Sequence, residues 1–187
     1  MRQIIRDLIE ICSVNLEIKE PIYEFGSAQV QEINQQKFAD LRPFFPNKIY
    51  VGTDYQEGEG VDMILDLHNI ALNNNIIGTA ICVDTLEHTE YPHKALQEIC
   101  RTMQYDGYVI IASVMNFHIH NKPDYWRFTT DGFNSLLKPF KNTYVIAIGE
   151  EIHPHTIIGI GSKNSTIPSN LINLLVELKA NYETPKE

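Results

Sequence analysis

Residues 76–114 read IIGTAICVDTLEHTEYPHKALQEICRTMQYDGYVIIASV and contain the pattern that decides the fold. The runs Ile76–Val83 and Tyr108–Val114 are apolar without polar alternation, which is typical of parallel strands covered on both faces. Between them, apolar residues recur at helical spacing, with Pro92 in the first turn and Gly107 beyond the end as a stop signal. The stretch therefore predicts a strand, helix and strand joined by a right-handed crossover.

Shorter runs of the same kind precede this unit. They predict three further strands, over Ile22–Phe25, Ile49–Thr53 and Val61–Leu65. Helical spacing predicts an amphipathic N-terminal helix carrying Ile4 to Cys12 and a second helix over Phe38–Phe45. Alternation of strands and helices is typical of an open, mostly parallel α/β sheet.

The C-terminal part departs from this alternation. Thr143–Ile148 and Thr156–Ile160 are joined by too short a stretch for a helical crossover, so we expect an antiparallel hairpin at the edge of the sheet. Thr129 can cap a helix before the hairpin, and leucines 171 to 178 form a last amphipathic helix after it. The predicted fold class is thus α/β, Rossmann-like and doubly wound, with an antiparallel C-terminal edge hairpin.

The length of 187 residues fits one domain. We expect residues 1–20 to form the N-terminal helix, 21–161 the α/β core, and 162–187 the last helix and the tail. That last helix packs back on the domain or forms a dimer surface, so the sequence leaves a homodimer as an alternative to a monomer. The net charge of −9 argues against nucleic acid or a membrane surface as partner.

The cysteines and the N-terminus bear on localisation. The three cysteines lie far apart inside apolar runs, which indicates reduced and buried thiols. Charged residues near the N-terminus interrupt the apolar stretch that a signal peptide needs, and no long apolar run predicts a membrane span. We therefore expect a cytoplasmic protein.

Four acidic residues lie in or directly after the predicted strands, namely Glu24, Asp54, Asp66 and Asp84. Ligands of open α/β sheets bind outside the carboxyl ends of the strands, where an acid after the second strand can accept both ribose hydroxyls. The loop from Gly26 lacks the G-x-G-x-x-G pattern that binds pyrophosphate. An acidic rim without phosphate donors suits a cationic nucleoside such as S-adenosylmethionine.

Three stretches resemble a known family. They are Ile22–Ser27, Tyr50–Asp54, and Val83–His88 followed by Glu98–Met103 and Asp106–Tyr108. Over residues 21–148 the chain resembles the class I, Rossmann-like S-adenosylmethionine-dependent methyltransferases. The resemblance implies a methyltransferase with S-adenosylmethionine as cofactor.

The resemblance also implies which residues contact that cofactor. Asp54 would bind the ribose, while Asp66 and Leu67 would flank the adenine. The methionine part would face Glu24, Gly26 and Ser27, and Asp84 with Thr85 would close the pocket.

The segment Asn116–His120 with Pro123–Thr129 is similar to one in a branch associated with sugar and polysaccharide modification. We therefore expect a small-molecule or glycan-linked acceptor. Its candidate contacts are an imidazole, an acid, two aromatic rings and a guanidinium, namely His88, Asp124, Tyr125, Trp126 and Arg127. Aromatic faces suit a sugar, and the guanidinium suits a carboxylate or phosphate, although it could equally pair with a surface acid.

His118 and His120 are the candidate catalytic bases. Two residues apart on an extended backbone, they would point to one side, and imidazole has a suitable pKa. With Asp124 they could instead hold a metal for a hydrolase, which we keep as an alternative while expecting no resident metal. Ala28 and Val30 stand where the family has glycines, and this departure favours a second alternative, a non-catalytic domain with an altered cofactor loop.

Overall fold

The computed structural model describes residues 1–29 and 39–183. Within these residues the strands form one seven-stranded sheet in the order β3-β2-β1-β4-β5-β7-β6. The strands are β1 (Ile22–Phe25), β2 (Tyr50–Asp54), β3 (Met63–Ile64), β4 (Ile77–Val83), β5 (Met103–Val114), β6 (Asn142–Gly149) and β7 (Pro154–Ser162).

The first five strands pair in parallel, and the last two pair antiparallel. Strand β7 lies between β5 and β6 and runs antiparallel to both. The predicted α/β sheet with an antiparallel hairpin at its C-terminal edge is therefore confirmed.

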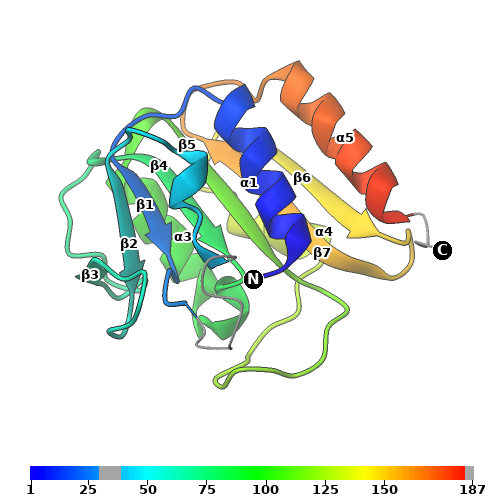
Figure 1. Cartoon of the computed structure of the whole chain (residues 1–187), viewed down its shortest axis with the longest axis horizontal. Helices are drawn as coiled ribbons and strands as arrows, with labels where there is room; N and C mark the ends of the chain where they lie inside the picture. Colours follow the sequence, from blue (N-terminus) through cyan, green and yellow to red (C-terminus); the bar gives the residue numbers. More distant parts are fainter. Residues whose placement is uncertain (30–38, 184–187) are drawn as a thin grey trace.

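Helices cover both faces of the sheet. Those in the described residues are α1 (Gln3–Asn15), α3 (Pro92–Thr102), α4 (Thr130–Leu136) and α5 (Ser169–Glu183), with two short 3-10 helices, η1 (Arg42–Phe44) and η2 (Leu86–His88). Helices α1 and α5 lie on one face, and α3 and α4 lie behind the sheet (Figure 1). In β4, Ile81 and Val83 pack in the α1 layer, whereas Ala80 and Cys82 pack in the α3 layer. Because alternate residues enter opposite cores, the strand is buried along its whole length.

Some predicted boundaries differ from the structure. Strand β5 begins at Met103, so Gly107 lies inside the strand and does not stop the helix. A Cβ on Gly107 would lie 2.2 Å from the carbonyl oxygen of Gly78 in β4. The close approach of β4 therefore explains why this position is a glycine. In the helix predicted over 38–45, Phe38 lies outside the described residues and Arg42–Phe44 forms η1. Cys100 is only partly buried, unlike the other two cysteines.

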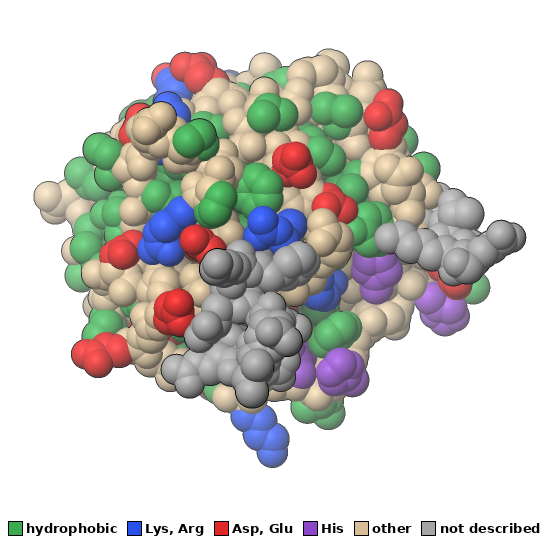
Figure 2. Space-filling model, in the orientation of Figure 1, with side chains coloured by type: hydrophobic (Ala, Val, Ile, Leu, Met, Phe, Trp, Pro, Cys, Tyr) green, Lys and Arg blue, Asp and Glu red, His purple; other side chains and the backbone are tan. Residues whose placement is uncertain are grey.

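The sheet determines where a site can form. The N-terminus and the long loop after β5 both lie near the carboxyl ends of the parallel strands (Figure 1). The face in Figure 2 carries interspersed acidic and basic side chains, while its histidines gather toward the lower right. No helix in the described ranges is both long and apolar enough to span a bilayer.

Candidate functional site

Two cavities open at the carboxyl ends of the strands. The larger cavity has a volume of about 930 Å³ and the smaller one about 450 Å³. The linings of the two cavities share five residues, namely Gly26, Ala28, Asp84, His88 and Asn121. The two cavities are therefore neighbouring parts of one site, and a volume of several hundred Å³ is usual for a small-ligand pocket.

Gly26 brings the ends of β1 and β4 together. Its φ is +81°, and a Cβ on it would lie 2.1 Å from Oγ1 of Thr85. The Thr85 hydroxyl lies 3.1 Å from the carbonyl oxygen of Phe25 and 2.9 Å from that of Val83, and donates to this pair of strand ends. Only glycine combines this backbone conformation with such close contact.

The loop after β1 follows a path that does not need glycine at residue 28. Ala28 is not among the described residues with positive φ. Instead, Gly60 in the loop after β2 has a φ of +87°, and a Cβ on it would lie 2.6 Å from the Ser27 carbonyl oxygen. The Ser27 hydroxyl donates to the Gly60 carbonyl at 3.0 Å. The glycine that allows close packing thus lies in the neighbouring loop, while Val30 lies outside the described residues.

Asp54 lies at the carboxyl end of β2 and lines the larger cavity. It is only 9% exposed. Its carboxylate accepts long hydrogen bonds from the backbone N–H groups of Ala28, at 3.2 Å, and Gln56, at 3.3 Å. A carboxylate has about four lone-pair sites, so two acceptor positions stay available for ligand hydroxyls.

Asp66 and Leu67 follow the short edge strand β3 and line the same cavity. Asp66 accepts hydrogen bonds from the backbone N–H and the ring Nδ1 of His68, at 2.8 and 2.9 Å. The first of these bonds lowers the pKa of Asp66 most. The predicted adenine contacts thus lie beside the predicted ribose contact, on the next strand outward.

Glu24 is a buried acid at the smaller cavity. It is 4% exposed and accepts a hydrogen bond from the Tyr50 hydroxyl at 2.8 Å. Burial raises the pKa of its carboxyl to about 7, although the Tyr50 hydrogen bond opposes the shift. A cation bound in this cavity would favour the ionised carboxylate.

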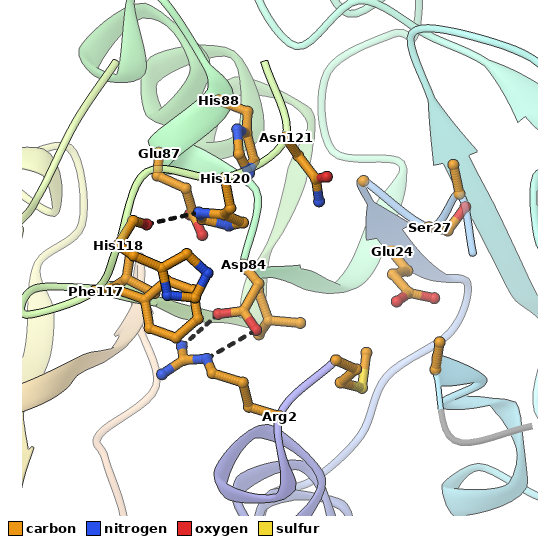
Figure 3. A pocket seen from close by; sticks show the side chains of 16 residues that line it. Arg2, Glu24, Ser27, Asp84, Glu87, His88, Phe117, His118, His120 and Asn121 are labelled. Atoms are coloured by element: carbon orange, nitrogen blue, oxygen red, sulfur yellow. Dashed lines mark hydrogen bonds and ion pairs between the residues drawn. The ribbon is translucent and has the colours of Figure 1, made fainter. Parts of the chain in front are cut away.

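Asp84 is held by a residue that the sequence analysis did not identify. The guanidinium of Arg2 donates from Nη2 to Oδ1 at 2.5 Å and from Nε to Oδ2 at 3.2 Å. Arg2 also donates to the Thr156 hydroxyl of β7. Figure 3 shows this ion pair at the side of the smaller cavity. No local pattern near the N-terminus predicts it.

His118 and His120 both line the smaller cavity, as Figure 3 shows. The His118 ring stacks on Phe117, with 4.3 Å between ring centroids. Nδ1 of His120 lies 3.3 Å from the His118 carbonyl oxygen. Burial lowers the pKa of His120, and the nearby His88 lowers it further. The structure thus brings both candidate bases to one cavity, with Phe117 as an additional lining residue.

Asp124 and Arg127 pair with each other. Arg127 donates to the two Asp124 oxygens at 2.5 and 2.8 Å, and Asp124 also accepts from the His120 backbone N–H at 2.9 Å. The Arg127 hydrogen bonds hold the pKa of Asp124 well below its usual range. Arg127 further donates to the Phe117 and His118 carbonyls. These groups therefore stabilise the loop. Arg127 pairs with an acid, but this acid is buried and is not the surface acid that the sequence suggested.

The other candidate acceptor residues are distributed unequally. Tyr125 lines the larger cavity and is 48% exposed. Trp126 is absent from the described linings of both cavities, and its Nε1 donates to the Thr89 carbonyl at 3.0 Å. His88 lies at the junction of the cavities, with Nδ1 2.6 Å from the Pro123 carbonyl oxygen. The structure thus brings Tyr125 and His88, but not Trp126, to the cavities.

Glu87 is a second residue for which the sequence suggested no role. It is fully buried, lines the smaller cavity, and accepts from the Ser113 hydroxyl at 2.6 Å. Burial raises the pKa of its carboxyl, and the charge of Asp84 raises it further. Its position directly before His88 in the quoted run was the available signal.

Residues 29–111 match the family model described as a methyltransferase domain. No curated protein sequence matches the chain.

Several solved structures have a similar fold over most of the chain. An S-adenosylmethionine-dependent methyltransferase from Archaeoglobus fulgidus has a TM-score of 0.65 at 12% identity, covering 86% of this chain and 94% of that one. A Thermotoga maritima structure, titled as a possible histamine N-methyltransferase, has a TM-score of 0.59 at 16% identity, covering 84% and 89%. A putative methyltransferase from Haloferax volcanii, solved with its Trm112 activator, has a TM-score of 0.59 at 11% identity, covering 85% and 90%. At such identities the likeness shows the fold.

Proposed function

We propose that the chain, in which residues 29–111 match a methyltransferase domain, uses S-adenosylmethionine to methylate a small-molecule or glycan-linked acceptor bound in the smaller cavity. One observation carries the proposal. The smaller cavity adjoins the larger one through shared residues that include Asp84 and His88, so a cofactor that spans their junction would bring its methyl group to an acceptor in the smaller cavity. Approach geometry of this kind is the main requirement of a group transfer.

The described residues fit the cofactor. The Asp54 carboxylate at the larger cavity has free acceptor positions for the ribose hydroxyls. At the smaller cavity the buried Glu24 offers a carboxylate to the cationic methionine part. When bound, S-adenosylmethionine supplies an electrophilic methyl group on a positively charged sulfur. The protein has to orient the acceptor, exclude water and accept the acceptor's proton.

We assign the proton acceptor to His118. Within the described chain no hydrogen bond occupies its ring nitrogens, whereas Nδ1 of His120 faces the His118 carbonyl oxygen. His118 stacks on Phe117, which fixes the plane of the ring at the cavity. An imidazole positioned in this way can remove the proton of a hydroxyl or amine as it is methylated.

The glycan-linked option is supported by exposed aromatic rings near the cavities. Phe117 is 36% exposed and lines the smaller cavity, while Tyr125 is 48% exposed and lines the larger one. Sugars bind to flat aromatic faces, as do other rings. The hydrolase alternative used Asp124 as a metal ligand, but both Asp124 oxygens are bonded to Arg127.

Two measurements test the proposal. Isothermal titration calorimetry with S-adenosylhomocysteine should give saturable binding, with a matching thermal shift. No heat and no thermal shift at millimolar ligand would favour the non-catalytic alternative. Transfer of a radiolabelled methyl group should then be measured on a panel of small alcohols, amines and saccharides. Cofactor binding without transfer to any panel member would contradict the proposed acceptor class.

A further inference from the structure

Three side chains that metal ions favour as ligands meet at the smaller cavity. Glu87 and His88 belong to η2, and His120 belongs to the loop after β5. One potential ligand atom from each residue lies within 4.8 Å of those from the other two. All three residues line the cavity, and Figure 3 shows their side chains grouped together.

The Glu87 carboxylate has one oxygen without a partner. Oε2 accepts from the Ser113 hydroxyl at 2.6 Å, whereas Oε1 is buried and has no hydrogen-bond partner among the described residues. The residue is 0% exposed. An unsatisfied buried carboxylate oxygen is costly, and a bound cation would satisfy it.

Both histidines are oriented by an acceptor at Nδ1. Nδ1 of His88 lies 2.6 Å from the Pro123 carbonyl oxygen. Nδ1 of His120 lies 3.3 Å from the His118 carbonyl oxygen and 3.5 Å from Oδ2 of Asp124. Because a carbonyl oxygen only accepts, it favours the proton on Nδ1 and leaves the Nε2 lone pair free. Metal-binding histidines typically have such partners at their other nitrogen.

We propose that Glu87, His88 and His120 bind one divalent transition-metal ion at the smaller cavity. Two imidazoles and one carboxylate suit Zn²⁺, Fe²⁺, Mn²⁺ or Co²⁺, whereas Mg²⁺ and Ca²⁺ prefer oxygen ligands throughout. Ligand atoms of a tetrahedral zinc site lie about 3.4 Å apart, so small side-chain movements from the present limit of 4.8 Å would complete the set. From the sequence we expected no resident metal, and the alternative set of ligands included Asp124, which is bonded to Arg127 instead.

Three protein ligands leave at least one coordination position for a ligand from the cavity. A metal there would bind an acceptor oxygen and lower the pKa of its hydroxyl, next to the His118 base. This role rests on the proposed function, whereas metal binding itself does not. It points to an acceptor that coordinates through oxygen.

The test uses the full-length protein, stripped with a chelator and titrated with Zn²⁺ and with Co²⁺. We expect one Zn²⁺ per chain by calorimetry and a visible absorption band with Co²⁺. His120→Ala and Glu87→Gln should each weaken Zn²⁺ binding by more than about 100-fold, because even outer partners of metal ligands contribute about 10- to 100-fold. His153→Ala, at an exposed histidine of the edge hairpin, should bind as the wild type does.

Wild-type protein that binds no stoichiometric Zn²⁺, or His120→Ala protein that binds it unchanged, would overturn the site. His120→Ala carries the test if the buried Glu87 variant fails to fold, since His120 lies in a loop. Binding of S-adenosylhomocysteine by the same variants separates this inference from the proposed function. Metal binding without cofactor binding supports the site alone, and full methyl transfer after chelation overturns the role of the metal.

Discussion

The guanidinium of Arg2 and the carboxylate of Asp84, 82 positions apart in the chain, form a two-point ion pair beside the smaller cavity. The side chains are 20% and 21% exposed, so solvent only partly screens the pair. Asp84 has a φ of +48°, an uncommon backbone conformation for a residue with a side chain. The pair therefore fixes the N-terminus against the end of β4 and occupies the Asp84 carboxylate.

Removing the Arg2 guanidinium should destabilise the protein. Arg2→Met leaves Asp84 without its charged partner, and we expect a loss of about 1 to 2 kcal/mol. For a chain of this length that loss lowers Tm by about 3 to 6 °C in calorimetry. Lys48→Met is the control, because the Lys48 pair with Glu20 is more exposed. An unchanged Tm for Arg2→Met would show that the ion pair adds nothing to stability.

Gly26 should not tolerate a side chain. Gly26→Ala introduces a Cβ at positive φ and 2.1 Å from Oγ1 of Thr85. We expect a loss of about 3 kcal/mol in chemical denaturation, from strain and overpacking together, and loss of S-adenosylhomocysteine binding. Adding Thr85→Ala removes the two nearest atoms and should restore part of the stability, but not the strain from φ. A double variant as unstable as the sum of the single ones would rule out the steric contact.

The Asp54 carboxylate should carry cofactor affinity. Asp54→Asn removes a charged acceptor from the larger cavity, and we expect a loss of about 1.5 to 3 kcal/mol, or about 10- to 150-fold in Kd. Calorimetry with S-adenosylhomocysteine measures the change. Asp106→Asn is the matched control near the start of β5, at the opposite end of the sheet. Equal losses in both variants would mean that Asp54 does not contact the ligand.

Glu24 should make stability depend on pH. Its pKa is about 7 in the folded protein and is near 4.5 when unfolded, so the folded state holds the proton more tightly between these values. Protonated Glu24 therefore contributes about 3 kcal/mol to the free energy of unfolding below about pH 4.5, and this contribution is lost as the pH rises to about 7. Glu24→Gln should lack this decline, measured by denaturant unfolding from pH 5 to 8. Tyr50→Phe removes a hydrogen bond that lowers the pKa of folded Glu24, so it should extend the decline to higher pH.

The same group should affect cofactor binding with the opposite sign. A cationic ligand prefers the ionised carboxylate, so S-adenosylmethionine affinity should rise as pH passes through about 7. Glu24→Gln should show a flatter profile in the same titration. Equal profiles for both proteins would place the cationic end of the ligand away from Glu24.

His118 should affect the chemical step more than binding. His118→Ala should lower kcat by about 10²- to 10⁴-fold, the usual contribution of a general base, with little change in S-adenosylhomocysteine affinity. His93→Ala is the control, because His93 lies on α3 and bonds to Ser135. A wild-type kcat for His118→Ala would contradict its assignment as base.

The local pattern of the sequence determined the sheet and the residues at the ends of its parallel strands. Apolar runs and helical spacing depend on near neighbours, so β4, α3 and the edge hairpin could be predicted without coordinates. The carboxyl ends of parallel strands lie at one edge of a sheet. This rule predicted that Gly26 and Asp54 lie at one site, and both line the larger cavity. The roles inferred for the histidines remain predictions.

The tertiary structure alone decided which distant groups meet. The Arg2 pair with Asp84 and the grouping of Glu87 and His88 with His120 depend on where the N-terminus and the loop after β5 lie at the carboxyl ends of the strands. No periodicity encodes such contacts, because they follow from packing between segments that are far apart in the sequence. Even for Arg127, only three residues from Asp124, the sequence left two roles open, binding an acceptor or pairing with an acid, and the folded loop pairs it with Asp124.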